Sequence, residues 1–379
     1  MSALARTDTS TLGRWWWTVD RWTVTALVLL IVAGMILSVT ASPPVAKRID
    51  LDPFHFVRRH MALLIPAGAT LFLVSLLSPR GVRRLALAVF VVAVALLITT
   101  LVAGTEIKGA SRWISLGGFT LQPSEFVKPG FAVVAAGMFA EHHRSRSTQR
   151  AQFPGNLVAT ALFAMVFALL LMQPDLGMAF VVSAVWFTQF CMAGLSLAWV
   201  GLFALLGMVG LIGAYLFFPH VASRVDRFLD PASGDSYQTD RALEAFMNGG
   251  LFGRGPGEGT VKQYLPDAHS DFVFAVAGEE FGLIACLAIL GLFAFVVLRG
   301  LTRLLQERNL FVLLAASGLL VQFGLQALIN LASTVRLMPT KGMTLPFLSY
   351  GGSSLLGLAI GMGMLLALTR HRADLGDSL

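Results

Sequence analysis

The chain has 379 residues, of which 56% are hydrophobic and only 13% are charged, and its formal net charge is +7. Soluble domains carry roughly 25% charged residues, so the composition excludes an ordinary soluble protein and indicates a polytopic membrane protein. The positive charge does not indicate a nucleic-acid partner, because the basic residues can be placed in loops or at the ends of apolar segments, where membrane topology accounts for them.

The first apolar run extends from Trp22 to about Ser42. It is longer than the hydrophobic region of a signal peptide, which has about 7–15 residues, and we interpret it as a retained signal anchor. The tryptophans at 15–17 precede it, as in an interfacial aromatic belt, unless they belong to a disordered tail. Cys191 and Cys286 both lie inside apolar runs, so we expect no disulfide framework.

Apolar stretches of membrane-spanning length recur along the chain, each near the ~20 residues that a spanning helix needs. They predict an all-α fold with about ten transmembrane helices, although short separators between the fifth and seventh stretches leave nine or eleven open. The predicted spans are 22–42, 61–78, 85–104, 125–141, 157–173, 177–193, 196–218, 271–298, 310–333 and 350–369.

One long hydrophilic segment, residues 219–270, separates the seventh and eighth spans. Its mixed polar and apolar content argues against disorder, and we expect short helices within it that lie at the membrane interface. With ten spans both termini share one side of the membrane. The short loops on that side carry more Lys and Arg than those on the other, which favours cytoplasmic termini. We therefore predict a cytoplasmic segment 1–21, a membrane domain 22–369 with the extracytoplasmic loop 219–270, and a cytoplasmic tail 370–379.

By parity, the loops after the third, fifth, seventh and ninth spans lie on one face. They hold nearly all of the unusual polar sequence, whereas the opposite loops are short arginine clusters. This pattern predicts a one-sided site, because a transporter more often places charges near the middle of the membrane.

Asp271 stands where the polar segment 264–270 meets the apolar run of the eighth span. A carboxylate beside hydrocarbon is costly unless it is paired or used. One interpretation is that Ser270 or Asp271 caps the eighth helix. The other is a general base, tuned by burial and by neighbours such as His269 and Asp267.

Glu125 and Lys128 lie three residues apart at the start of the fourth span and so share a helical face. They could form a simple intrahelical ion pair. A membrane-embedded lysine normally finds a partner, and Asp271, on the same face at a similar depth, is a second candidate for Lys128.

Three further acidic residues have both structural and functional interpretations. Glu279 and Glu280 lie two turns into the eighth span, where they either pack against polar atoms or join the site. Asp175 either caps the sixth span or contributes to a shared polar cavity.

Several elements could bind an anion. The glycine-rich stretch 248–259 is not a phosphate loop, because it lacks the Gly-Lys-Ser/Thr ending. It is either a flexible hairpin or a means of bringing Arg254 to an anion. Lys341 and Ser349 precede or open the tenth span, and helix N-termini favour anions, so a diphosphate-bearing lipid could be held there. The histidines are scattered, and we expect no metal cluster.

A set of ordered segments identifies the sequence as similar to the SEDS (shape, elongation, division and sporulation) family, which includes FtsW, RodA and SpoVE. Within that family the chain most resembles the division members rather than the elongation members. The matching segments are 109–114, 122–128, 173–177, 224–231, 264–272, 278–280 and 339–354.

The resemblance implies a peptidoglycan glycosyltransferase of the inner membrane, at the division septum, that polymerises lipid II. It assigns the essential aspartate to Asp271, with inverting displacement of undecaprenyl diphosphate, and the family's glutamate–lysine pair to Glu125 and Lys128. We expect Lys128 to keep Asp271 ionised, and Lys128, Arg254 or a divalent cation (Mg²⁺ or Mn²⁺) to offset charge on the leaving group. The remaining residues predicted to bind substrate or support the site are Arg112, Gln122, Asp175, His269, Lys341 and Ser349.

By the same resemblance, the partners are lipid II, the undecaprenyl-diphosphate-linked glycan and a class B penicillin-binding protein transpeptidase of the FtsI type. The division regulators FtsQ, FtsL, FtsB and FtsN are further expected partners. Three alternatives stay open: a lipid II flippase, a scaffold that only recruits division proteins, and a RodA-type elongation polymerase.

Overall fold

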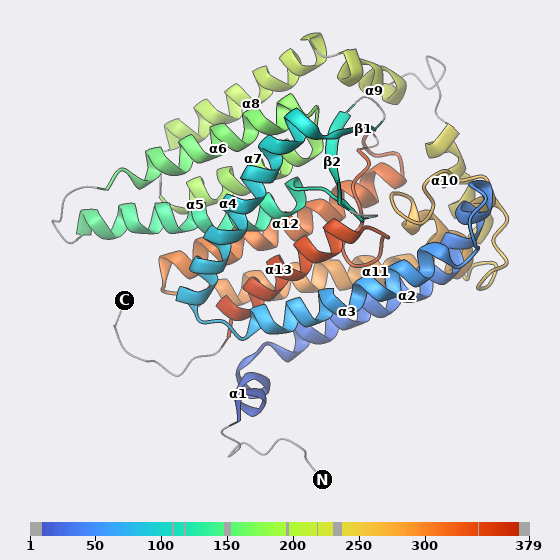
Figure 1. Cartoon of the computed structure of the whole chain (residues 1–379), viewed down its shortest axis with the longest axis horizontal. Coiled ribbons are helices and arrows are strands. Elements are labelled where there is room, and N and C mark those ends of the chain that lie inside the picture. Colours follow the sequence, from blue (N-terminus) through green and yellow to red (C-terminus); the bar gives the residue numbers. More distant parts are fainter. Residues whose placement is uncertain are drawn as a thin grey trace.

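The computed structural model describes residues 10–107, 110–116, 119–147, 153–194, 197–217, 219–229, 237–339 and 341–370. Ten long helices coincide with the ten predicted spans, so the predicted helical fold is confirmed (Figure 1). They are α2 (Arg21–Arg48), α3 (His55–Ser75), α4 (Pro79–Ala103), α5 (Ser124–Ser147), α6 (Gly155–Met172), α7 (Leu176–Met192), α8 (Leu197–Phe217), α11 (Val273–Leu304), α12 (Leu310–Thr334) and α13 (Gly352–Leu368).

Within the described residues, six helices are long and apolar enough to cross a membrane: α2, α3, α4, α6, α11 and α12. Shorter apolar helices are α7, residues 201–217 of α8, and α13. α5 is less apolar because it carries Glu125 and Lys128 at one end and a basic cluster at the other. The chain is a multi-pass membrane protein.

The loops contain elements of their own. Residues 219–270 hold α9 (Pro219–Leu229), α10 (Tyr237–Gly249) and the 3₁₀ helix η2 (Val261–Gln263), which confirms the predicted short helices. A small antiparallel sheet in the order β1-β2-β3 was not predicted. Strands β1 (Thr105–Ile107) and β3 (Phe119–Leu121) are too short for alternation to identify them, and the sequence of β2 (Ala110–Leu116) does not alternate strictly between polar and apolar residues. A short helix α1 (Thr11–Thr18) precedes the first span.

α5 and α12 form the centre of the bundle. α5 packs against α4, α6, α7, α12 and α13, and α12 is buried on nearly all sides. A helix that is apolar all round is stable only in such a surrounded position. α8 lies at the periphery, where its Phe203 packs edge-on against Trp186 and Phe190 of α7 at 4.9 and 5.1 Å between ring centroids.

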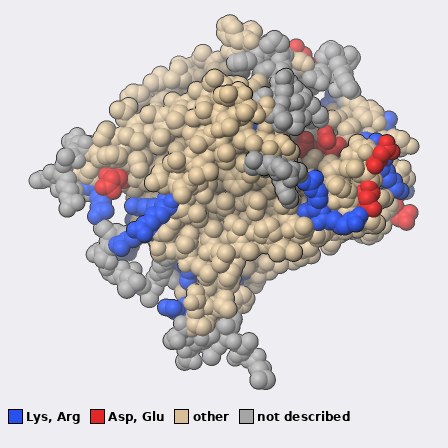
Figure 2. All heavy atoms as spheres, viewed as in Figure 1, with Lys and Arg blue, Asp and Glu red and all other residues tan. Residues whose placement is uncertain are grey.

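The polar elements divide between two ends of the bundle. α9, α10 and the strands lie at one end, and α1 and the last turn of α13 lie at the other (Figure 1). Charged side chains gather towards the two ends in the space-filling view, with a broad uncharged band between them (Figure 2). This distribution is expected of a protein whose middle faces hydrocarbon.

Charged side chains link separate segments at the end of the bundle that holds both described chain termini. Arg370 donates to the hydroxyl of Thr18 at 2.9 Å and to the carbonyl of Leu76 at 3.3 Å. Asp20, which is buried, pairs with Arg299 at 3.1 Å and Arg303 at 3.0 Å. Burial alone would raise the pKa of Asp20, but hydrogen bonds from Arg299 and Thr23 and the charge of Arg303 hold it below its ordinary value.

α11 is interrupted at Gly282, whose backbone has φ +77° and ψ −175°. The groups released by this break bind the loop that follows α10. Leu283 N donates to Gly250 O at 2.9 Å, and Gly255 N donates to Glu280 O at 3.0 Å. Irregular backbone at membrane depth is tolerated only where protein or water satisfies it, so the glycine-rich stretch 248–259 is a strap on α11 rather than a flexible hairpin.

Candidate functional site

Asp271 ends a tight turn that leads into α11. Asp267 has a positive φ of +50°, and its carbonyl accepts the N–H groups of Ser270 at 3.0 Å and Asp271 at 3.1 Å. The N-cap of α11 is Phe272, with no side-chain capping bond. The predicted capping by Ser270 or Asp271 is therefore wrong, because the turn ends one residue later than the polar side chains. The carboxylate of Asp271 is half-buried.

The loop before α13 passes directly beside Asp271. Gly342 has φ +62°, and a Cβ at this position would lie 3.4 Å from Asp271 Oδ2. Asn330 of α12 fixes the two segments together: its Nδ2 donates to the carbonyl of Asp271 at 2.9 Å and to that of Met343 at 2.6 Å. Asp271 is thus clamped between α12 and the loop that carries Lys341.

Ser349 and His269 extend this clamp. The hydroxyl of Ser349 donates to the carbonyl of Ser270 at 2.5 Å and accepts the N–H of Leu345 at 2.8 Å. Tyr350 N donates to the carbonyl of His269 at 2.9 Å. α13 begins only at Gly352, so Ser349 precedes the helix instead of opening it, and its hydrogen bonds join two loops.

Of the two partners considered for Lys128, the structure shows Glu125. Their side chains are buried and paired at 2.8 Å. Lys128 Nζ also donates to Gln326 Oε1 of α12 at 2.7 Å. The amide of Gln326 then donates to the carbonyl of Thr344 at 3.2 Å. The expectation that Lys128 holds Asp271 ionised is thereby revised: the pair is connected to Asp271 through α12, where Asn330 lies one turn beyond Gln326.

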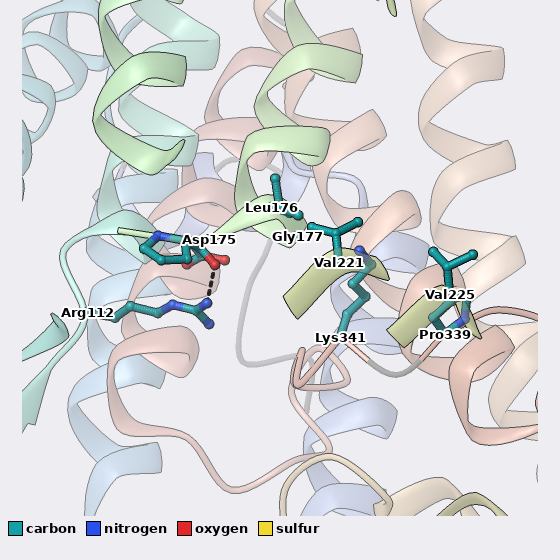
Figure 3. Close-up of a pocket in the computed structure, with 9 residues that line it drawn as sticks. Arg112, Asp175, Leu176, Gly177, Val221, Val225, Pro339 and Lys341 are labelled. Carbon is teal, nitrogen blue, oxygen red and sulfur yellow. Dashed lines mark hydrogen bonds between the residues drawn. The ribbon is translucent and has the colours of Figure 1, made fainter. Parts of the chain in front are cut away.

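Arg112, Asp175 and Lys341 line one pocket (Figure 3). Arg112 of β2 donates to the carbonyls of Gln173, at 3.1 Å, and Pro174. Asp175 caps α7 through Met178 N at 3.4 Å and also faces the pocket, so both interpretations of this residue hold. The cavity volume is about 30 Å³, which is room for about one water.

Gln122 connects β3 with this pocket. Its side chain donates to Asp175 Oδ2 at 3.5 Å, and its backbone N–H donates to Ser353 Oγ at 3.0 Å. The loops after the third, fifth, seventh and ninth spans therefore meet at one end of the bundle, as parity predicted.

Arg254 is not part of this cluster. Its guanidinium binds the carbonyl and side-chain oxygens of Asn248 at 2.7 Å each, beside a groove lined by α10. Glu279 and Glu280 hold the strap. Glu279 accepts the N–H groups of residues 260–262 and the amide of Asn248, and Glu280 pairs with Lys262. These contacts support the structural interpretation of both glutamates.

Gln326 and Asn330 were missed as site residues. They lie four residues apart in α12, which places them on one face of an otherwise apolar helix. Gln322 extends the same face by one turn and is also buried. Buried amides repeating every four residues in a spanning helix are costly unless paired, and this spacing could have identified them.

A sequence model of the family described as "Cell cycle protein", which covers FtsW, RodA and SpoVE, matches residues 21–374. The chain belongs to this family. It is 45% identical to "Probable peptidoglycan glycosyltransferase FtsW" of Caulobacter vibrioides, over 98% of this chain and 94% of the relative. The protein of the same name from Aeromonas salmonicida is 36% identical, over 92% of this chain and 89% of the relative.

Two solved structures share the SEDS fold. One is described under "Structural coordination of polymerization and crosslinking by a peptidoglycan synthase complex", with a TM-score of 0.74 and 30% identity. The other is the rod shape determining protein RodA of Thermus thermophilus, with a TM-score of 0.65 and 28% identity. Each covers 93% of this chain and 97% of the solved chain.

The site thus joins a half-buried carboxylate to two cations on a single face. Asp271 can accept a proton, while Lys341 and Arg112 line a pocket that includes the loop beside Asp271. Among the described residues, no group of three or more His, Cys, Asp or Glu side chains could hold a metal ion.

Proposed function

We propose that the chain is a peptidoglycan glycosyltransferase that polymerises lipid II into glycan strands during septal wall synthesis, with Asp271 as the general base. Full-length similarity to proteins named peptidoglycan glycosyltransferase FtsW supports the activity and the division role. The observation that carries the role of Asp271 is its position: it is half-buried, lies one residue before the N-cap of α11, and is clamped beside the loop of Lys341.

In the proposed reaction the 4-hydroxyl of the acceptor GlcNAc attacks the anomeric carbon of the undecaprenyl-diphosphate-linked chain. Asp271 accepts the hydroxyl proton as the new C–O bond forms. The bond to the diphosphate breaks with its electron pair, and the α-linkage becomes β in one displacement. Lys341 and Arg112 replace Lys128 and Arg254 as the cations that offset the leaving diphosphate, because they line one pocket and Lys341 directly precedes Gly342, which lies beside Asp271.

The Glu125–Lys128 pair has a supporting role in this proposal. It is buried between α5 and α12, and Gln326 transmits its position to the loop before α13. A divalent cation, Mg²⁺ or Mn²⁺, would supply further positive charge to the leaving diphosphate, and no step above depends on it.

The proposed partner is a class B penicillin-binding protein transpeptidase, supported by the similarity to a chain from a synthase complex that coordinates polymerization and crosslinking. We further propose that the division regulators FtsQ, FtsL, FtsB and FtsN act on this pair at the septum. Both termini would lie in the cytoplasm and the Asp271 end outside it.

Asp271→Asn tests the proposal. The amide keeps the shape of the carboxylate but cannot accept the hydroxyl proton, so we expect polymerisation of lipid II by the purified protein with its transpeptidase to fall by at least about 100-fold. Glycan chains resolved by electrophoresis provide the measurement.

Asp52→Asn is the matched control, because Asp52 is an exposed carboxylate in the loop between α2 and α3. It should polymerise at the rate of the unmodified protein. Glycan synthesis by Asp271→Asn at the control rate would eliminate the general-base role. Translocation of lipid II across vesicles without any polymer would favour the flippase instead.

A further inference from the structure

Four aromatic rings hold the Asp271 turn against α3. The ring of His269 stacks on Phe56 of α3, with centroids 4.6 Å apart and planes 28° apart. Tyr350 closes the cluster, at 5.3 Å from both Phe56 and His269. His60, one turn further along α3, lies 6.1 Å from Tyr350. The turn that positions Asp271 therefore depends on ring packing against a helix that carries none of the predicted site residues.

The two histidines of this cluster are unusual because each has a buried nitrogen without a hydrogen-bond partner. His60 is 1% exposed and His269 is 9% exposed. The unpartnered atoms are His60 Nε2 and His269 Nδ1. A buried polar atom that is left without a hydrogen bond destabilises the folded state. Phenylalanine would stack equally well without this cost, so packing alone does not explain why imidazoles occupy both positions.

Protonation distinguishes imidazole from phenylalanine. Burial lowers the pKa of His269 to about 4, opposed by the carboxylate of Asp267 and assisted by the guanidinium of Arg48. His60 interacts electrostatically with His269, and Arg59 faces Tyr350. A further titratable ring, His55, packs edge-on against Phe56 with centroids 5.3 Å apart. Burial has the largest effect on His269 and outweighs the attraction of the Asp267 carboxylate, so a positive charge on the packed ring is disfavoured.

The stability of the packed turn depends on pH, because packing lowers the pKa of His269. An unpacked histidine has a pKa of about 6.5, so the released turn binds a proton more readily than the packed turn between about pH 4 and pH 6.5. The packed state keeps its full stability above about pH 6.5 and loses it as the pH falls through this window.

We propose that His60 is a positioning residue for Asp271: with Phe56 and His269 it keeps the Asp271 turn packed on α3 while the imidazoles are neutral, and it releases the turn in acid. This inference rests on the proposed function only for the role of Asp271. It adds α3 to the elements that position Asp271, and it predicts that polymerisation falls in acid because the turn is released.

The test measures the rate of lipid II polymerisation at pH 5.5 and at pH 7.5. For each variant, the result is the rate at pH 5.5 divided by the rate at pH 7.5. His60→Phe keeps a ring but removes the proton site, so the ratio should rise by about three- to tenfold over the unmodified protein. Phe56→Ala removes the stacking ring without replacing any titratable residue. The packed turn is then easier to release, and the ratio should fall by a similar factor.

His143→Phe is the matched control, because His143 is exposed at the opposite end of α5, and its ratio should not change. His60→Gln, which also lacks a proton site, replaces His60→Phe if the larger ring prevents folding, as judged by the thermal unfolding midpoint at pH 7.5. Ratios that stay constant, or that move in the same direction for His60→Phe and Phe56→Ala, would overturn the proposal.

A second readout does not depend on polymerisation. In a protein with Cys191 and Cys286 replaced by alanine, Ser270→Cys should react with a thiol reagent faster at pH 5.5 than at pH 7.5, after correction for the thiolate fraction. His60→Phe should abolish this acceleration. If the acceleration persists in His60→Phe, the positioning role of His60 is overturned. Asp271→Asn tests the general-base role independently, so the two proposals can fail separately.

Discussion

At the scale of single residues, Glu125 and Lys128 show how much a buried ion pair depends on its surroundings. Both side chains are almost fully removed from solvent, and Gln326 provides a further acceptor for the ammonium. Taking two charges out of water is expensive, and the pair compensates only while both members are present. Its sequence position suggested a lysine reaching towards Asp271; the contacts instead indicate a connection between α5 and α12.

Lys128→Met should destabilise the protein by about 3–5 kcal/mol, because it leaves Glu125 charged, buried and unpaired. The double variant Glu125→Gln/Lys128→Met should recover most of this loss. Thermal unfolding midpoints in detergent measure the effect, and Glu141→Gln, an exposed position on the same helix, serves as the control. A double variant as unstable as Lys128→Met would show that the two residues do not act as a pair.

At the scale of elements, the break in α11 provides backbone groups that hold the strap before the Asp271 turn. Gly282 occupies a left-handed region, and a Cβ there would lie 2.4 Å from Gly253 N and from the carbonyl of Leu251. The strap is further held by the carboxylate of Glu279, which accepts the N–H groups of η2 just before the Asp271 turn. The break, the strap and the turn therefore form one connected structure.

Gly282→Ala should cost more than about 2 kcal/mol, because the side chain combines backbone strain with a clash against backbone that cannot move freely. Gly291→Ala lies in the same helix with open space around its Cβ and should be neutral or slightly stabilising. Unfolding midpoints of the two variants are compared in the same detergent. Equal midpoints would mean that the strap does not depend on this glycine.

At the scale of the whole molecule, the two polar ends define the topology. One end gathers Asp20, Arg299 and Arg370, and the other gathers the loops around Asp271. The bundle places these groups on opposite sides of the apolar band, which is the arrangement expected for cytoplasmic termini and an extracytoplasmic site.

Single cysteines test this orientation in intact cells, in a protein with Cys191 and Cys286 replaced by alanine. Glu258→Cys, exposed in the strap, should react with a membrane-impermeant thiol reagent. His143→Cys, exposed at the opposite end, should react only after the cells are opened. The reverse pattern would invert the topology and place Asp271 in the cytoplasm, where the proposed reaction could not build the wall.

Much of the fold and part of the site could be predicted from the sequence alone. The ten helices follow from hydrophobic length, which is a local property, and parity then placed the polar loops on one face. Asp271, Asp175 and the Glu125–Lys128 pair were recognisable because charges are rare beside long apolar runs.

Only the tertiary structure decided how these residues are used. It ended the Asp271 turn at Phe272, paired Lys128 with Glu125, moved Arg254 into another groove, and revealed Gln326, Asn330 and the ring cluster on α3. Each of these outcomes depends on which distant segments pack together. Hydrophobic patterns determine which residues are buried, but the partner of a buried polar group is set by the geometry of the assembled helices.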